Sequence, residues 1–173
     1  MAAFDVDLGF IEGSGTHPDL MVQRWRDDRL VVVAAPNHPF AAKRVSLRSL
    51  ANATWIVRER GSGTREATDR WLIDGLGRML VELELGSNEA VKRVVASGIG
   101  LGCLSSFAVA GALERGELVE LVTPLPLMHR VFSIVMHRKR SLGSTARAFI
   151  QHVRLKASIP ITGVHRQPRR TGP

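Results

Sequence analysis

Several residue types and patterns are scarce or missing from this 173-residue chain. It has one cysteine, Cys103, and no tyrosine, and a single thiol excludes an internal disulfide and a multi-cysteine metal site. No run of about 18 apolar residues is present, so the sequence predicts no membrane span. The first residues also lack the basic and apolar regions of a secretory signal. Together these absences favour a cytoplasmic protein.

The net charge of +8 is compatible with nucleic-acid binding. Part of the excess lies in 165–170, within a segment that contains Pro and Gly but no apolar periodicity, and another part lies in 137–140. The first of these predicts a disordered basic tail over 158–173. Because no zinc pattern and no RNA-binding aromatic motif accompanies the charge, direct nucleic-acid binding by this chain is not favoured.

Strand and helix patterns alternate along the middle of the chain. Continuous or alternating apolar runs indicate strands, and apolar residues spaced by three or four indicate helices, with serines at several expected helix starts. The expected strands are 30–35, 55–57, 80–85, 101–104 and 118–122, and the expected helices are 46–50, 64–76, 88–97 and 107–114. The alternation of apolar and acidic residues over 80–85 predicts a half-buried strand. This order predicts an α/β fold with a parallel sheet and helices on both faces.

Shorter elements flank this block, with strands expected at 7–11 and 131–136 and a helix around 146–153. They are too few to form a second sheet by themselves, and they look like the remains of another lobe whose beginning is missing. Such a remnant would expose apolar surface, so association or exchange of segments between chains is expected.

The most informative segment is 55–65, in which a short apolar strand leads through a Gly-Ser-Gly-Thr turn into a helix. The glycines let backbone N–H groups crowd one point, and Ser62 and Thr64 add hydroxyls at the positive end of the helix dipole. Such an assembly suits a small anion, which Arg65 could also reach with a forked hydrogen bond. The alternative is an ordinary helix N-cap.

A second loop with hydroxyls is expected at the same place. In open α/β sheets, ligands bind beyond the carboxyl ends of the strands, at the topological switch point. The switch is expected between strands 55–57 and 101–104, so Leu104 and Ser105 should lie near the 61–64 turn. The alternative role for Ser105 is again a helix cap.

Motifs for catalysis and cofactor binding are few and incomplete. The glycines of 98–102 resemble a dinucleotide fingerprint, but they join a helix to a strand and lack the third glycine. The histidines have no metal-ligand spacing. Only Glu59 and Cys103 could serve an enzyme at the expected crevice, and the apolar setting of Cys103 indicates an inert thiol. The sequence therefore predicts a protein that is not an enzyme and has no cofactor or metal, with a small enzyme as an alternative.

Taken together, these segments resemble the effector-binding region of LysR-type transcriptional regulators over about residues 5–157. The matching pieces are 5–13, 30–40 with its Pro-x-His-Pro turn, the Arg-Glu-x-Gly-Ser-Gly-Thr-Arg loop at 58–65, 86–102 and 131–138. The resemblance implies two periplasmic-binding-protein-like lobes joined by two crossover strands, with a small effector in the cleft. One lobe would be complete, with a parallel-rich, Rossmann-like sheet, and the other partial.

The resemblance also implies boundaries and site residues. Residues 1–26 would be the remnant of the first lobe, 27–127 the second lobe, and 128–157 the return to the first lobe. The residues implied at or near the second lobe's side of the effector site are Ser62, Gly63, Thr64, Leu104 and Ser105. Those implied at the hinges are Glu12, Gly13 and Pro124.

Members of this family are DNA-binding dimers or tetramers. The resemblance does not extend to the family's N-terminal DNA-binding domain or to the start of its first lobe, so the sequence is expected to be a fragment whose parent protein reaches DNA through that domain. The residues expected at a dimer face, on the helix 64–76 and the edge strand 80–85, are Trp71, Leu80 and Glu82, with core packing as the alternative role of Trp71. The function predicted is the sensing of a small, anionic metabolite, and the alternative is a solute-binding protein of a transport system.

Overall fold

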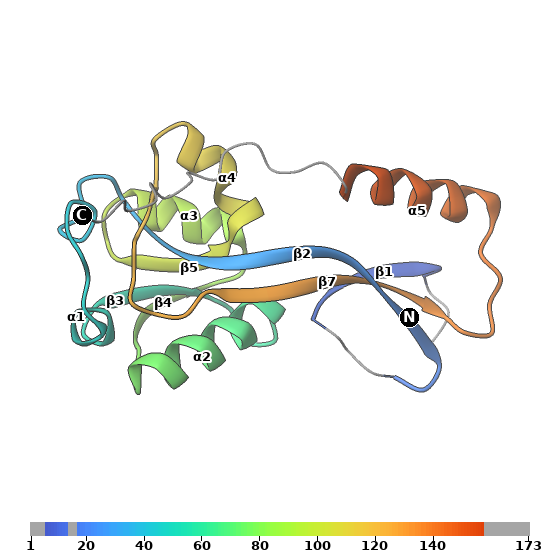
Figure 1. Ribbon diagram of the computed structural model, residues 1–173, viewed down its shortest axis with the longest axis horizontal. Coiled ribbons are helices and arrows are strands. Elements are labelled where there is room, and N and C mark those ends of the chain that lie inside the picture. The colour runs from blue at the N-terminus through green and yellow to red at the C-terminus, as the bar shows by residue number, and fades with distance from the viewer. Residues whose placement is uncertain (1–5, 14–16, 158–173) are drawn as a thin grey trace, which may run out of the picture.

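The computed structural model describes residues 6–13 and 17–157, so the expected tail at 158–173 lies outside the described residues. The strands are β1 (Leu8–Glu12), β2 (Leu20–Ala34), β3 (Thr54–Arg58), β4 (Leu80–Leu85), β5 (Leu101–Ser105), β6 (Val119–Glu120) and β7 (Met128–His137). The helices are α1 (Leu47–Ala51), α2 (Gly63–Leu76), α3 (Asn88–Ala96), α4 (Ser106–Glu114) and α5 (Ser144–Ala157). The strands form one sheet in the order β1-β7-β2-β5-β3-β4, and β6 pairs with β2 (Figure 1).

Serine side chains start four of the helices, as the sequence predicts. The hydroxyl of each N-cap serine accepts a hydrogen bond from a backbone N–H in the first turn, which satisfies one of the donors that a helix start leaves open. These residues are Ser46, Ser62, Ser87 and Ser105. Helix α2 ends at Gly77, whose φ of +73° is readily adopted only without a side chain.

Helices cover both faces of the central sheet, which confirms that expectation. Alternate residues of β2 point to opposite faces, so Leu30 and Val32 join the core beneath α1 and α2. Val31 and Val33 join the core beneath α3 and α4. The α/β class predicted from the sequence is therefore confirmed, with two separate apolar layers around one sheet.

The sheet is mixed, and in this respect the expectation of a parallel sheet is wrong. β3 pairs in parallel with β4 and β5, but β2 lies antiparallel to β5, β6 and β7. The expected strand 30–35 is the end of the much longer β2, and the expected strand 118–122 shortens to β6. β4 is the sheet edge as predicted. Half-burial was expected along this strand, but its side chains are exposed except at Leu85, which is half-buried.

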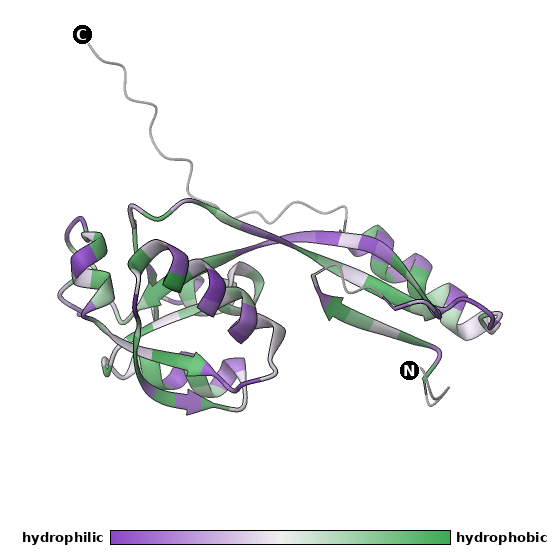
Figure 2. Ribbon diagram, turned by 90° about the horizontal axis from the view of Figure 1, so that it is seen from below, coloured by the Kyte–Doolittle hydropathy of each residue, from purple (hydrophilic) through white to green (hydrophobic). Residues whose placement is uncertain are grey.

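β2 and β7 cross together from the helix-covered part to a smaller part formed with β1 and α5 (Figures 1 and 2). They pair from Leu20 opposite His137 to Leu30 opposite Met128, with a bulge between Arg24 and Arg26. The proposed lobe boundary at 26/27 lies beside this bulge, and the boundary at 127/128 coincides with the start of β7. No helix in the described part of the chain is long and apolar enough to cross a membrane.

Candidate functional site

The two hydroxyl-bearing loops lie at the carboxyl ends of β3 and β5, which are hydrogen-bonded neighbours. Helix α2 leaves β3 toward the outer strand β4, whereas α4 leaves β5 toward β2, so this is the topological switch point of the sheet. Thr64 stands in the first turn of α2, and Ser105 ends β5. Both side chains are buried, and a network of charged groups connects them.

A buried ion pair forms the centre of this network. Arg130 on β7 donates from Nε to Oδ2 of Asp28 on β2 at 2.7 Å, and their side chains are 6% and 0% exposed. The other carboxylate oxygen of Asp28 accepts from the hydroxyl of Ser105 at 2.8 Å and from that of Ser106 at 3.3 Å. Asp28 is thus a fully buried carboxylate whose charge is balanced by Arg130 and by hydroxyl donors.

Glu12, the last residue of β1, reaches the same network from the other part of the molecule. Its Oε2 accepts from Arg130 Nη1 at 2.7 Å and from the hydroxyl of Thr64 at 2.9 Å. A Cβ placed on Gly63 would lie 2.8 Å from this oxygen, so the carboxylate rests directly on the first turn of α2. Figure 1 shows the end of β1 approaching the start of that helix.

One donor of the Arg130 guanidinium is left over. Its Nη2 is buried and has no hydrogen-bond partner among the residues that the structure describes. A buried charged group with an unused donor is costly, and a role in binding a ligand is one explanation for keeping it. The cluster of Glu12, Asp28, Thr64, Ser105 and Arg130, called the Arg130 cluster below, is therefore the candidate site.

The structure brings only some of the predicted ligand residues into this cluster. Thr64 and Ser105 belong to it, and Gly63 contacts its Glu12. Ser62 caps α2 through a 3.4 Å hydrogen bond from the N–H of Arg65, and Leu104 is buried in the core beneath α3 and α4. Ligand binding by Ser62 and Leu104 stays a prediction from the sequence.

Arg65 faces the edge of the sheet, away from the Arg130 cluster. Its guanidinium pairs with Asp69 at 2.7 Å and with Glu84 at 2.9 Å, and it donates to the backbone oxygen of Arg58 at 2.8 Å. In this arrangement Arg65 braces the start of α2 against β3 and β4. A ligand-binding role would require these contacts to change, and it too stays a prediction.

The expected hinge residues occupy different settings. Gly13 follows β1 with a φ of +94°, donates to the backbone oxygen of Val131 at 2.7 Å and accepts from the Ser133 hydroxyl at 3.0 Å. Glu12 contacts the Arg130 cluster. Pro124 is exposed in the loop between β6 and β7, before the paired crossover begins. Their roles as hinges stay predictions.

The sequence interpretation missed Asp28 and Arg130. Asp28 lies on β2 and Arg130 on β7, and the sequence predicted only the apolar parts of these two strands. A charged residue within a strand is usually solvated, so neither side chain was expected at a buried site. The available signal was the position of the charged stretch 24–29 directly before a continuous apolar run. Nothing in the sequence alone showed that β7 would pair with this stretch.

The groups that could have supported catalysis are unsuited to it. Burial raises the pKa of the Cys103 thiol to about 12, so the nucleophilic thiolate is scarce at neutral pH. The hydrogen-bonded guanidinium of Arg58 holds the pKa of Glu59 at about 2, which makes this carboxylate a weak base. No group of three or more metal-ligating side chains occurs among residues 6–13 and 17–157.

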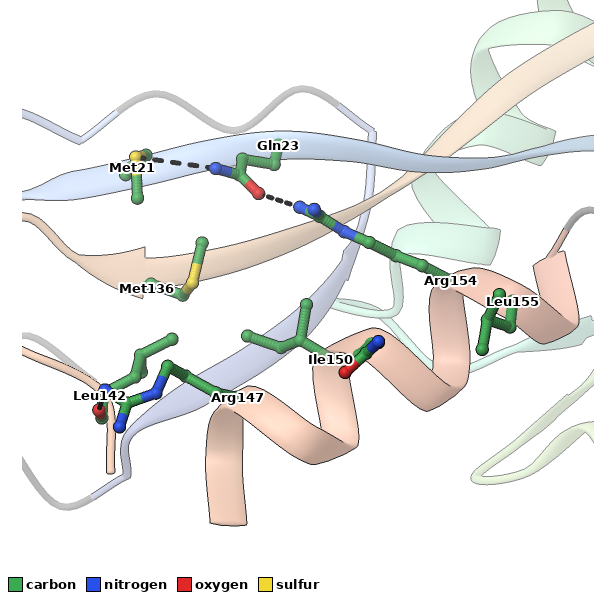
Figure 3. A pocket seen from close by; sticks show the side chains of 9 residues that line it. Met21, Gln23, Met136, Leu142, Arg147, Ile150, Arg154 and Leu155 are labelled. Carbon is green, nitrogen blue, oxygen red and sulfur yellow. Dashed lines mark hydrogen bonds between the residues drawn. The ribbon is translucent and has the colours of Figure 1, made fainter. Parts of the chain in front are cut away.

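A groove of about 580 Å³ lies away from the Arg130 cluster, between α5 and the far ends of β2 and β7. Figure 3 shows its lining, in which Met136 and Ile150 supply apolar surface and Arg154 hydrogen-bonds Gln23. No residue of the Arg130 cluster contributes to it.

Comparison with known proteins identifies relatives of this chain. YeiE of Escherichia coli K12, named as an uncharacterized HTH-type transcriptional regulator, is 42% identical over 149 residues, which cover 86% of this chain and 51% of that protein. The HTH-type transcriptional activator CmpR of Synechocystis is 33% identical over 149 residues, which cover 85% of this chain and 49% of that protein. The chain thus spans about half the length of these curated relatives.

Solved structures confirm the fold, and a family model identifies the family. The regulatory domain of Synechocystis PCC6803 CcmR in complex with 2-PG superposes with a TM-score of 0.80 at 30% identity, covering 91% of this chain and 76% of that one. The effector binding domain of QuiR in complex with shikimate gives a TM-score of 0.74 at 18% identity, covering 90% and 73%. These domains share the periplasmic-binding-protein-like α/β fold, and a model of the LysR substrate binding domain matches residues 1–158. The chain belongs to the LysR substrate-binding domain family.

Proposed function

We propose that this domain senses a small anionic metabolite at the Arg130 cluster and passes the signal to a DNA-binding domain in a longer protein. The observation that carries the proposal is the buried Arg130 with an unused Nη2 donor, set between two hydroxyl-bearing loops at the switch point. A guanidinium and the start of a helix both favour an anion. The CcmR regulatory domain, which holds 2-PG, supports a small-molecule ligand for a domain of this shape.

The signal would be a change in how the two parts of the domain lie against each other. The Arg130 cluster combines Glu12 from β1 with Thr64 from α2, so a ligand bound there touches both parts. A ligand shifts such an equilibrium only by its difference in affinity for the two arrangements, and contacts to both parts supply that difference. In a regulator acting on DNA in the cytoplasm, the shift would reposition the DNA-binding domains. That the curated relatives are transcriptional regulators favours this role over solute transport.

Replacing Thr64 by valine is the test of the site. Valine keeps the size of the buried side chain and removes the hydroxyl that contacts Glu12 and Arg130. A panel of carboxylated, sulfonated and phosphorylated metabolites is screened for thermal stabilisation of the unaltered chain. For a metabolite that stabilises it, we expect Thr64→Val to weaken binding by about tenfold or more, the effect of losing a hydrogen bond to a charged group, as measured by calorimetry.

The matched control is Thr68→Val, the same substitution at a buried position one turn further along α2. This variant should bind the metabolite within about twofold of the unaltered chain, because the Thr68 hydroxyl has no hydrogen-bond partner among the described residues. Equal loss in both variants would mean that the effect comes from the packing of α2, and unchanged affinity in Thr64→Val would place the effector elsewhere.

We also infer that the face of α2 and β4 pairs with a second subunit in the longer protein. β4 is a sheet edge with apolar side chains in solvent: Leu80 is 49% exposed, and Val81 and Leu83 are exposed as well. Exposed strand edges of this kind pair readily with another chain. Glu82 lies on the same strand, whereas Trp71 is half-buried and donates to the backbone oxygen of Pro126 at 3.0 Å, which favours a mainly internal role for its ring.

Leu80→Glu should therefore shift the longer regulator toward smaller assemblies without unfolding it, because a charge at the centre of an apolar interface opposes association. Light scattering across a concentration series measures the change in mass. Val122→Glu is the control, since Val122 is 70% exposed and follows β6 instead of β4. A mass unchanged by Leu80→Glu would show that β4 is not in the interface.

A further inference from the structure

We propose that the Glu12 carboxylate occupies the position of the effector anion in this structure, and that the effector binds by displacing it. The inference rests on the proposed function, since it assigns a mode of regulation to the same site. It concerns a residue that the sequence suggested only as part of a hinge. Glu12 would thus serve as a built-in competitor, tethered to β1, for the place on Arg130 and α2.

The contacts of Glu12 are those expected of a bound anion. Its Oε2 accepts from a guanidinium nitrogen at 2.7 Å and from a hydroxyl at 2.9 Å. The same oxygen lies against Gly63 in the first turn of α2, where a Cβ would come within 2.8 Å of it. Guanidinium, hydroxyl and helix start are the three groups that proteins commonly use to hold carboxylates and phosphates.

The two carboxylates of the Arg130 cluster differ in how easily they could leave. The Asp28 side chain is 0% exposed and lies within β2, with acceptors filled by Arg130, Ser105 and Ser106. The Glu12 side chain is 30% exposed and stands at the end of β1. Glu12 can therefore move into water at small cost, because its charge regains hydration, whereas Asp28 would need the strand itself to separate.

The charge of the cluster makes displacement necessary. One guanidinium already faces two carboxylates, so an additional anion would be repelled by uncompensated negative charge. When Glu12 leaves, the incoming anion restores the same balance and can also use the free Nη2 of Arg130. The exchange breaks the contact that Glu12 makes between β1 and α2. The bound ligand then takes the place of a direct hydrogen bond between the two parts of the domain.

Acetate tests this proposal, because it carries the same charged group as Glu12 without the tether. In Glu12→Ala the position is vacated, and acetate should bind to the 173-residue chain with a dissociation constant lower by about tenfold than in the unaltered chain, as expected if Glu12 occupies the position about nine-tenths of the time. An acetate titration followed by NMR measures the dissociation constant, with chloride at equal ionic strength as the reference. The amide signals of Gly63 and Thr64 should shift with acetate.

The matched control is Glu66→Ala, which removes an exposed carboxylate from the first turn of the same helix. It should leave acetate affinity unchanged within about twofold, because screened surface charges act weakly. If Glu12→Ala proves unfolded, Glu12→Gln keeps the size and drops the charge, and a smaller gain in the same direction is expected. Equal acetate binding in the unaltered chain and the Glu12 variants, or binding by none of them, overturns the proposal.

The outcome is separable from that of the proposed function. A metabolite whose binding depends on Thr64, combined with no acetate gain in Glu12→Ala, would leave effector sensing at this site intact and refute displacement of Glu12. An acetate gain in Glu12→Ala, with no metabolite able to bind the unaltered chain, would support the displaceable carboxylate and refute sensing.

Discussion

Asp28→Asn will lower the free energy of unfolding by about 3 kcal/mol, the usual range for removing one partner of a buried ion pair. The Asp28 side chain is fully buried and accepts from Arg130 and from the hydroxyls of Ser105 and Ser106. Asparagine cannot form the ion pair, so the buried Arg130 keeps only Glu12, whose side chain is 30% exposed, as a charged partner. Urea denaturation measures the change, and Tm should fall by about 6–12 °C for a chain of this size.

The neighbouring Asp27→Asn is a stringent control for this prediction. It makes the same chemical change one residue earlier on β2, but the Asp27 side chain is 64% exposed and its ion pair with Arg24 lies in solvent. Exposed pairs contribute little, so its effect should stay within about 0.5 kcal/mol. If Asp28→Asn and Asp27→Asn lower the free energy of unfolding equally, burial does not determine how much the ion pair of Asp28 stabilises the fold.

Trp55→Ala will destabilise the domain by about 4 kcal/mol, the range found for deleting large aromatic side chains from a core. Trp55 lies on β3 with no exposed surface and packs with Leu72 of α2 and Leu50 of α1. Its indole N–H also donates to the backbone oxygen of Leu50 at 3.0 Å. The substitution leaves a cavity and removes this hydrogen bond, although Leu50 O still accepts from the backbone N–H of Ala53 at 3.2 Å, and chemical denaturation measures the sum of the two losses.

Trp55→Phe separates the two contributions. Phenylalanine fills much of the cavity but cannot donate to Leu50, so a loss of about 1–2 kcal/mol is expected from the missing hydrogen bond and the remaining space. Val122→Ala, at a 70% exposed position, should be neutral within about 0.5 kcal/mol. A Trp55→Ala variant as stable as the unaltered chain would mean that this core rearranges to fill the space.

The Arg130 cluster shows where sequence interpretation succeeded and where it stopped. The turn at 61–64 and the loop at Ser105 were found because glycine and serine have local roles at the ends of helices. Their convergence followed from the rule for parallel strands, which β3 and β5 obey. Asp28 and Arg130 were missed because their pairing joins strands about a hundred residues apart, and local patterns carry no information on such contacts.

The prediction of a parallel sheet was wrong at β2 for a related reason. An apolar run indicates a buried strand but not its direction, so β2 was expected to continue the parallel order although it lies antiparallel to β5. The half-burial expected for β4 was also wrong, because alternation of apolar and acidic residues was interpreted as one face turned to a core. At the edge of the sheet those side chains stand in solvent.

The sequence by itself determined the α/β class, the helix starts, the edge position of β4 and the family resemblance, because these depend on short-range spacing and residue type. Only the tertiary structure decided that Glu12, Asp28 and Arg130 meet beside Thr64 and Ser105. Burial, which sets whether a charge is solvated or must find a partner, arises only when distant strands pair. The chemistry of this site is therefore a property of the folded chain.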